Sequence, residues 1–461
     1  MRMKILLIRN HPKGNINTRL PEKLNRVQGI YPPLGLAYIA AVLEEGGHKV
    51  KILDVEALDL NTEESKKEIF RQKADIVGIT CMSSTLPGAL EAARFAKESG
   101  AKVVLGGPQL AVYPKETLSY DYIDYGCIGE GEYTLLELAN ALEQNSGIEK
   151  IDGLVYKKDK NIIANKSRVV EDINQLPFPA RHLLPMNKYD CIITKKPVTT
   201  MITTRGCPFR CGFCFKQPSD KIIRFRNAKN IVDEMEDCIK KYNVKEIMFY
   251  DDIMTLKKQR MLDICNEITK RKLDIQWEAP TRADCVDEEL LREMKKAGCI
   301  RLRYGVESGD ARILDLMNKR ATIPLIKKAF RMTHQLGIET FAYFIIGYLH
   351  ETPQTMQSTI NLAKELNPDW VMFTIATPYP STNLYSLAIK EGIVNGDYWK
   401  SFTLGKTTGR LPFLVDNAEK WVSKAYKEFY FRPSFIIKKF KKLNSFDTFK
   451  KYLRGALAIG R

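Results

Sequence analysis

Short apolar runs alternate with segments of helical hydrophobic periodicity throughout the first 145 residues. The apolar runs predict strands at residues 4–8, 49–53, 75–80, 102–105 and 122–128. Between them, apolar positions recur three or four residues apart, which predicts helices at residues 34–45, 63–73, 87–98 and 132–142. This alternation is typical of a doubly wound α/β domain built on a parallel sheet.

Small residues follow three of these predicted strands. The loops are Ser83-Ser84-Thr85, Gly106-Gly107-Pro108 and Gly129-Glu130-Gly131. Parallel sheets bind ligands at the carboxyl ends of their strands, so these loops are candidates to hold a large polar cofactor. The alternative is that such loops simply need glycine. The spacing Gly126-x-x-Gly129-x-Gly131 is not a dinucleotide fingerprint, which excludes a nicotinamide or flavin site of that type.

The pattern divides the chain into four parts, with boundaries predicted at residues 1–145, 146–196, 197–390 and 391–461. The second part is a linker with a hairpin over residues 153–163 and a proline-rich stretch near Pro177. From residue 198 to about 386, strand and helix alternate again and predict six βα units, which form a partial (β/α)6 barrel of the TIM type. The last part is predicted to be helical and basic.

Composition and charge limit the possible locations and partners. The chain of 461 residues is 44% hydrophobic and 28% charged, so it is expected to fold into globular domains. No apolar run reaches the roughly 18 residues of a membrane span. The N-terminal apolar run is too short for a signal peptide, which predicts a cytoplasmic protein whose ten cysteines are thiols or metal ligands. The net charge of +17 permits nucleic acid, an anionic membrane or an acidic substrate as partner.

Three closely spaced cysteines carry the strongest chemical signal. Cys207, Cys211 and Cys214 follow an apolar strand at residues 198–202 and have the spacing CxxxCxxC. Such a loop can ligate three irons of a cubane iron–sulfur cluster and leave the fourth iron open. A zinc site completed by Cys191 or His182 is the alternative, but neither has a zinc-finger spacing.

These cysteines and the segments that follow them resemble the radical S-adenosylmethionine enzymes. Phe213 matches the aromatic residue before the third cysteine of that family, and Phe249-Tyr250-Asp251-Asp252 matches the segment that binds the methionine ammonium. The resemblance implies that Arg282 binds the carboxylate and that Glu307 and Ser308 bind the ribose. It also implies that the strand ending at Gly347 packs on adenine. The implied cofactors are a [4Fe-4S] cluster and S-adenosylmethionine, with metal ligands Cys207, Cys211 and Cys214.

The N-terminal part resembles the Rossmann-like cobalamin-binding domain that precedes the barrel in one large class of these enzymes. The resemblance rests on residues 31–40, on Gly106-Gly107-Pro108 and on Gly129-Glu130-Gly131. It implies a cobalamin site formed by residues of three loops: Ser83, Ser84, Gly106, Gly107, Gln109, Gly129 and Glu130. The Asp-x-His-x-x-Gly motif is absent, which suggests cobalamin bound without a histidine ligand. Gln109 stands where relatives often have histidine after the glycine pair; it keeps the capacity for hydrogen bonds but has no titratable proton. A degenerate scaffold without cobalamin is the alternative.

Together the resemblances imply methylation of an unactivated carbon by way of a 5′-deoxyadenosyl radical and methylcobalamin. The same cofactors also serve ring formation or oxidation, so a cyclase or oxidase stays open. Methylthiotransferases that modify tRNA are disfavoured because they carry a second three-cysteine cluster, whereas only Cys81 and Cys127 lie in the first 150 residues. A non-catalytic corrinoid or redox sensor is disfavoured by the full set of binding segments. The expected one-electron donor is a small redox protein such as flavodoxin or ferredoxin.

The C-terminal 30 residues are strongly basic. Residues 432–461 contain nine Lys or Arg and one acidic residue, Asp447. Ile436, Ile437, Phe440 and Leu443 recur at helical spacing, which predicts a basic amphipathic helix that contacts a membrane surface and suits a lipid or other apolar substrate. A helix that packs its apolar stripe on the barrel is the alternative, and nucleic-acid binding is the least favoured.

Overall fold

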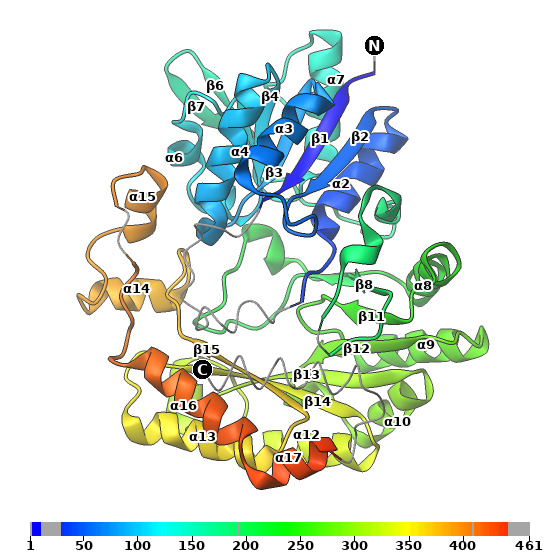
Figure 1. The fold of residues 1–461 in the computed structure, drawn as a ribbon, viewed down its shortest axis with the longest axis vertical. Coiled ribbons are helices and arrows are strands. Elements are labelled where there is room, and N and C mark those ends of the chain that lie inside the picture. The colour runs from blue at the N-terminus through cyan, green and yellow to red at the C-terminus, as the bar shows by residue number, and fades with distance from the viewer. Residues whose placement is uncertain (1, 11–28, 192, 408–409, 441–461) are drawn as a thin grey trace.

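The N-terminal domain is a doubly wound sheet, seen at the top of Figure 1. The computed structural model describes residues 2–10, 29–191, 193–407 and 410–440. Its parallel strands have the order β2-β1-β3-β4-β5. They span β1 (Lys4–Arg9), β2 (Lys49–Asp54), β3 (Ile76–Thr80), β4 (Lys102–Gly106) and β5 (Tyr125–Cys127). The predicted strands are thus present, with small differences at their ends.

Helices cover both faces of this sheet. They are α2 (Leu34–Glu45), α3 (Thr62–Gln72), α4 (Leu86–Glu98), α5 (Pro108–Val112), α6 (Pro114–Leu118) and α7 (Gly131–Gln144). Ile5 and Leu7 of β1 pack in the core that includes α2 and α7, whereas Leu6 and Ile8 pack in the core with residues of α3 and α4. Because successive strand residues point to opposite faces, β1 must be apolar at every interior position.

The hairpin predicted within the linker extends this first sheet. Strands β6 (Leu154–Lys158) and β7 (Asn161–Ala164) pair with each other, and β6 pairs antiparallel with β5. Leu154 and Val155 are fully buried, so the hairpin shares the core of the N-terminal domain.

The second sheet is a half-barrel of six parallel strands in the order β15-β14-β13-β12-β11-β8. Its strands are β8 (Val198–Met201), β11 (Glu246–Phe249), β12 (Gln276–Thr281), β13 (Cys299–Glu307), β14 (Glu339–Ile346) and β15 (Trp370–Ile375). Its outer helices are α8 (Ala228–Tyr242), α9 (Lys258–Lys270), α10 (Glu288–Lys296), α11 (Ala311–Leu316), α12 (Ile323–Gln335) and α13 (Pro353–Leu366). The predicted six βα units are confirmed, and Figure 1 shows the half-barrel below the N-terminal sheet.

The C-terminal helices close two sides of the molecule. They are α14 (Asn383–Lys390), α15 (Tyr398–Thr403), α16 (Ala418–Tyr430) and α17 (Pro433–Phe440). Helix α15 returns to the N-terminal domain, where Tyr113 donates a hydrogen bond of 2.7 Å to Asp397. Helix α16 packs on β15, and α17 packs on α16.

Two tyrosines of α16 cover the outer edge of β15. The Tyr426 hydroxyl lies 3.1 Å from the amide nitrogen and 3.3 Å from the carbonyl oxygen of Phe373. One helical turn later, the Tyr430 hydroxyl lies 3.1 Å from the same two groups of Val371. Four residues of helix rise about 6 Å, close to the roughly 6.6 Å spanned by two residues of strand. The two hydroxyls therefore fall in register with alternate residues of the edge strand.

The predicted basic helix is described as far as residue 440. Phe435 is buried against the ring of Phe429, so it anchors α17 on the barrel. Ile436 and Ile437 of the predicted apolar stripe are 38% and 56% exposed. The side chain of Phe440 and all of residue 443 lie outside what the structure describes. Within the described residues, no helix is both long and apolar enough to cross a membrane.

Candidate functional site

The cysteine loop begins beside the carboxyl end of β8. Strand β9 (Thr204–Arg205) leads into the loop, and β10 (Arg224–Phe225) pairs with β9 where the chain leaves it. Gly206 has φ +91°, and a Cβ there would lie 2.6 Å from the carbonyl oxygen of Ile222. Only glycine therefore fits at the entrance of the loop without moving the backbone.

Backbone contacts fix the middle of the loop against two other segments. The Gly212 amide donates to the Met317 carbonyl at 2.8 Å, and its carbonyl accepts from the Leu384 amide at 2.8 Å. Phe209 lies under the guanidinium of Arg282, whose central carbon is 3.7 Å from the ring centroid. The loop therefore has a defined conformation before any cofactor is considered.

Cys207, Cys211 and Cys214 are partly exposed, as is Cys285, whereas the other six cysteines are buried. Burial raises the pKa of the Cys211 thiol and raises that of Cys214 to about 11. Metal binding must therefore displace protons from these thiols at neutral pH. In the described part of the chain, no three His, Cys, Asp or Glu side chains are grouped as ligands of a single ion. A cubane differs because each thiolate ligates a separate iron.

Asp251 and Asp252 follow β11 and have different surroundings. Asp251 is buried and accepts hydrogen bonds from the amides of Thr203, at 2.6 Å, and Thr204, at 3.2 Å. It also accepts from the Thr203 hydroxyl. Its carboxylate therefore fixes the turn that precedes the cysteine loop. Asp252 is half-exposed, and its carboxylate lies 3.8 Å from Lys216 Nζ within the loop.

Arg282 and Glu307 lie on neighbouring strand ends and share contacts with Lys319. Arg282 donates two hydrogen bonds of 2.8 Å to Asp284 and a third, of 2.7 Å, to the Lys319 carbonyl. Glu307 has φ +70° at a bulge in β13 and accepts from Lys319 Nζ at 2.8 Å. These contacts hold the guanidinium fork and the carboxylate at the edge of the barrel next to Phe209.

Gly347, Ser308 and Phe213 occupy the neighbouring part of the same edge. Gly347 has φ +77°, and its amide and that of Tyr348 donate to Glu351 at 2.6 and 2.9 Å. Ser308 is buried, with its hydroxyl 3.2 Å from that of Thr359. Phe213 packs in an apolar cluster that includes Tyr348.

Tyr348 was not identified from the sequence. Its hydroxyl is buried, has no hydrogen-bond partner among the described residues and lies 3.0 Å from the position of a Cβ on Gly212. Burial raises its pKa to about 12, and burial also raises the pKa of Glu351 to about 7. A buried hydroxyl without a partner, directed at the cysteine loop, fits a site that binds a further group there.

The residues predicted to bind cobalamin lie at the carboxyl ends of β3, β4 and β5. Ser83 and Ser84 form a short 3₁₀ turn after β3, and Gly106 ends β4. Gly107 has φ +106°, and a Cβ there would lie 2.7 Å from the Cys81 carbonyl oxygen. Gly129 has φ +83°, and a Cβ there would lie 2.3 Å from the carbonyl oxygen of residue 168. Glycine therefore allows these loops to approach closely and leaves backbone exposed at the sheet edge.

Gln109 and Glu130 use their side chains in contacts with other parts of the chain. Gln109 is fully buried and donates to the hydroxyls of Thr117, at 3.2 Å, and Thr403, at 2.9 Å. Glu130 forms ion pairs with Arg205, at 3.0 Å, and Arg224, at 2.7 Å. Both side chains therefore join the N-terminal domain to other parts of the chain.

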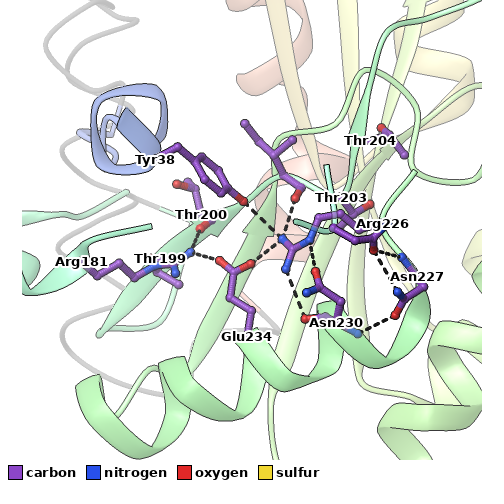
Figure 2. Close-up of polar contacts among 12 residues, drawn as sticks. Tyr38, Arg181, Thr199, Thr200, Thr203, Thr204, Arg226, Asn227, Asn230 and Glu234 are labelled. Atoms are coloured by element: carbon purple, nitrogen blue, oxygen red, sulfur yellow. Dashed lines mark hydrogen bonds and ion pairs between the residues drawn. The ribbon is translucent and has the colours of Figure 1, made fainter. Parts of the chain in front are cut away.

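A buried network at the domain boundary was also missed from the sequence (Figure 2). Glu234 of α8 is fully buried between Arg181, at 2.6 Å, and Arg226. Arg226 also donates to the hydroxyl of Tyr38 on α2, at 3.3 Å. Burial alone would raise the pKa of Glu234, but the two guanidinium groups outweigh it and lower that pKa.

The interior of the half-barrel carries a second set of charges that the sequence reasoning missed. Arg301 pairs with Glu278 at 2.5 Å and with Glu246 at 3.3 Å. Arg303 lies 3.5 Å from Glu278, and its guanidinium carbon is 5.3 Å from the ring centroid of Tyr250. Burial raises the pKa of Glu246 to about 7. The signal was present as single glutamates in β11 and β12, Glu246 and Glu278, and as arginines at alternate positions of β13, Arg301 and Arg303.

A half-barrel with an open three-cysteine loop at its carboxyl edge defines a radical S-adenosylmethionine enzyme. Two family models match the chain: the B12 binding domain over residues 24–139 and the radical SAM superfamily over residues 201–363. An uncharacterised methyltransferase of Pyrococcus horikoshii is 35% identical over 434 residues, which cover 93% of this chain and 94% of the relative. The chain belongs to the cobalamin-binding family of radical S-adenosylmethionine enzymes, whose cofactors are a [4Fe-4S] cluster, S-adenosylmethionine and cobalamin.

Two further relatives span most of the chain. The anaerobic magnesium-protoporphyrin IX monomethyl ester cyclase of Rubrivivax gelatinosus is 30% identical and covers 94% of this chain and 79% of its own. A solved radical S-adenosylmethionine methyltransferase, TsrM from Kitasatospora setae with cobalamin and [4Fe-4S] cluster bound, superposes with a TM-score of 0.69. It is 18% identical, and the match covers 85% of this chain and 78% of that one. This structural likeness supports the two-domain fold.

Proposed function

We propose that the protein methylates an unactivated carbon of a small molecule, using cobalamin and radical S-adenosylmethionine chemistry. The observation that carries the proposal is the relationship to a methyltransferase over nearly the whole chain. When bound, the cluster and S-adenosylmethionine supply a 5′-deoxyadenosyl radical, and cobalamin supplies the methyl group. The loop after β5 lies against the start of the cysteine loop, since Glu130 and Glu132 pair with Arg205, and this suits a substrate held between the cofactors.

Cys207, Cys211 and Cys214 are the proposed ligands of the cluster. Their partial exposure leaves the thiols accessible, and the Gly206 and Gly212 contacts limit the conformations of the loop. Three thiolates on four irons leave one iron open, which a catalytic cluster requires.

S-adenosylmethionine is proposed to bind between Asp252, Arg282 and Glu307. Of the two adjacent aspartates, Asp252 is the more accessible, so it suits the ammonium group, whereas Asp251 holds the turn before the cysteines. Arg282 is held by Asp284 and the Lys319 carbonyl through Nε and Nη2, so we propose that it donates to the carboxylate of S-adenosylmethionine through Nη1. Ser308 and Gly347 are proposed to contact S-adenosylmethionine chiefly through backbone, because Ser308 is buried.

Cobalamin is proposed to bind along the loops after β3, β4 and β5. Ser83, Ser84, Gly106, Gly107 and Gly129 offer hydroxyl and backbone groups at this edge, where parallel sheets bind ligands. Gln109 and Glu130 support these loops through their contacts with Thr403, Arg205 and Arg224.

Product analysis after anaerobic reconstitution tests the proposal. Reconstituted protein with hydroxocobalamin, a reductant and a cell extract as substrate source is expected to form S-adenosylhomocysteine and 5′-deoxyadenosine together. Cys207→Ala should abolish 5′-deoxyadenosine but retain cobalamin, whereas Cys285→Ala, at the partly exposed cysteine outside the loop, should retain both. Absence of S-adenosylhomocysteine while 5′-deoxyadenosine still forms would refute methyl transfer.

A cyclase is the second candidate, favoured by the 30% identity to the magnesium-protoporphyrin ester cyclase over 94% of the chain. Its distinguishing result in the same assay is 5′-deoxyadenosine alone. Addition of magnesium-protoporphyrin IX monomethyl ester as a probe should then increase that product.

We also propose that a one-electron donor such as flavodoxin or ferredoxin reduces the cluster.

We further propose that residues 432–461 contact an anionic membrane that holds a lipid or apolar substrate. Ile436 and Ile437 support the membrane contact because both are exposed on α17. Flotation with vesicles of phosphatidylcholine and phosphatidylglycerol should recover the full chain but less of an Ile436→Ser/Ile437→Ser variant. Equal recovery of both would refute the contact.

A further inference from the structure

The two strands at the base of the cysteine loop place two arginines side by side. Strands β9 and β10 pair antiparallel, and this register puts Arg205 opposite Arg224. The residues between them, 206–223, include all three loop cysteines. Whatever fixes these two arginines therefore fixes both ends of the segment that carries Cys207, Cys211 and Cys214.

Carboxylates of the N-terminal domain hold both arginines. Arg205 pairs with Glu130 at 3.0 Å and with Glu132 at 2.5 Å, and Arg224 pairs with Glu130 at 2.7 Å. Glu130 also accepts from the Val170 amide. The four charged side chains are between 5% and 16% exposed, so water screens these pairs only weakly.

Glu130 is the member of this group that touches both arginines. Burial would raise its pKa, but hydrogen bonds and charge from Arg224 and Arg205 outweigh burial and lower it. The carboxylate is thus ionised at neutral pH and balances two adjacent guanidinium groups. Without it, the two cations would face each other across β9 and β10, and of the two glutamates only Glu132, paired with Arg205, would remain.

Glu130 also belongs to the last of the three loops at the carboxyl edge of the first sheet. It lies between Gly129, whose φ of +83° allows close approach to residue 168, and Gly131, the first residue of α7. One side chain therefore joins the loop proposed to contact cobalamin to the base of the loop proposed to ligate the cluster.

We propose that Glu130 is a positioning residue that couples the two cofactor sites. Cobalamin that orders the loop at residues 129–131 also orders Arg205 and Arg224, and thereby the cysteine loop. Because such coupling is reciprocal, the cluster must raise the affinity for cobalamin by the same factor by which cobalamin raises the affinity for the cluster. The inference rests on the proposed function only in requiring that both cofactors bind.

Cobalamin affinity, measured with and without the cluster, tests the coupling. Hydroxocobalamin is titrated into full-length protein under anaerobic conditions, once after reconstitution with iron and sulfide and once after chelation of iron. The wild type is expected to bind at least about 5-fold more tightly with the cluster, which is the lower end of typical coupling. Glu130→Gln keeps the size of the side chain but loses its charge. The ratio of its cobalamin affinities with and without the cluster should therefore fall to near 1.

Glu137→Gln is the matched control. Glu137 lies on the same helix, α7, and pairs with Arg168 at 2.6 Å; among the described residues no ion pair joins it to Arg205 or Arg224. Its ratio should equal that of the wild type. Arg205→Lys is the second variant, because it keeps the charge at the base of the loop but loses the fork that reaches both glutamates. It guards against misfolding of Glu130→Gln and should give an intermediate ratio.

A spectroscopic measurement separates coupling from a general loss of stability. The electron paramagnetic resonance signal of the reduced cluster, recorded in excess dithionite and separated from the signal of cob(II)alamin, should change when hydroxocobalamin is added to the wild type and to Glu137→Gln, but not to Glu130→Gln. Equal ratios and equal spectral changes in wild type and Glu130→Gln would overturn the coupling alone. Failure of the wild type to retain cobalamin would overturn both this inference and the proposed function.

Discussion

The carboxylate of Glu234 balances two buried guanidinium groups, so replacing it with glutamine is expected to destabilise the protein strongly. Glu234 itself is fully buried, with Arg181 at 2.6 Å on one oxygen and Arg226 on the other. Glutamine has nearly the same shape but carries no charge, and its amide group can accept a hydrogen bond only through its single oxygen.

Two charge-assisted hydrogen bonds of this kind contribute about 1.5–3 kcal/mol each. Removing one partner of a buried ion pair costs about 3–5 kcal/mol, since it leaves a charge without compensation. The sum over the two hydrogen bonds and the cost of breaking a buried ion pair are of similar size. We therefore expect Glu234→Gln to lower the free energy of unfolding by about 3–5 kcal/mol. The substitution should weaken the packing between the two domains in particular, because Arg226 also donates to Tyr38 of the N-terminal domain.

Urea unfolding followed by tryptophan fluorescence and circular dichroism measures this effect. The control is Glu236→Gln on the same helix, whose partly exposed carboxylate pairs with Lys240 at 3.1 Å and lies 3.8 Å from Arg271. A surface pair contributes less than about 1 kcal/mol, so this variant should resemble the wild type. A difference of less than about 1 kcal/mol between the two variants would refute the account of the buried network.

The pH dependence provides an independent check. The pKa of Glu234 is lower in the folded state than in the unfolded chain, so its contribution is complete above the ordinary glutamate pKa. It is lost as pH falls through the folded-state value. The difference between wild type and Glu234→Gln should therefore be constant from pH 7 to about 5 and shrink below that.

Three other changes have expected outcomes. Gly206→Ala should lower the iron retained after reconstitution, because its Cβ would meet the Ile222 carbonyl at 2.6 Å, whereas Gly35→Ala, with open space around it, should not; equal iron contents would contradict this. Tyr348→Phe should leave the stability of cluster-free protein unchanged or raise it by about 1 kcal/mol in urea, since it removes a buried hydroxyl without a described partner. Glu351 has a pKa raised to about 7, so it binds more protons when folded, and stability falls as pH rises from about 4.5 to 7. The free energy of unfolding of Glu351→Gln should fall less between pH 5.5 and pH 8 than that of the wild type. An equal fall in both proteins would count against the raised pKa of Glu351.

Local sequence signals predicted the elements of the first sheet well. The helix predicted at residues 34–45 has those bounds, and the one predicted at 63–73 begins next to Asn61, which forms a capping box with Glu64. Such signals depend on neighbouring residues, so one sequence is enough to recognise them. The cysteine spacing is equally local, which is why the loop could be recognised and placed after β8.

Contacts between distant segments could not be predicted in the same way. Glu130 and Gln109 were predicted as cofactor residues because they lie in the right loops, yet their side chains contact Arg205, Arg224 and Thr403. The sequence places a residue on a strand end but does not state which way the side chain points once another domain packs there. The ligand and cofactor residues among the candidates stay predictions until the cofactors are bound.

The tyrosine pair on α16 has a consequence for how copies of the chain interact. An open half-barrel leaves the backbone of its last strand unpaired, and such an edge can recruit a strand from another molecule and start aggregation. Tyr426 and Tyr430 occupy the amide and carbonyl groups of Phe373 and Val371, so that edge cannot form a continuous ladder with a second sheet. A chain shortened before Ala418 would keep its barrel strands but lose this cover, and is expected to self-associate through β15.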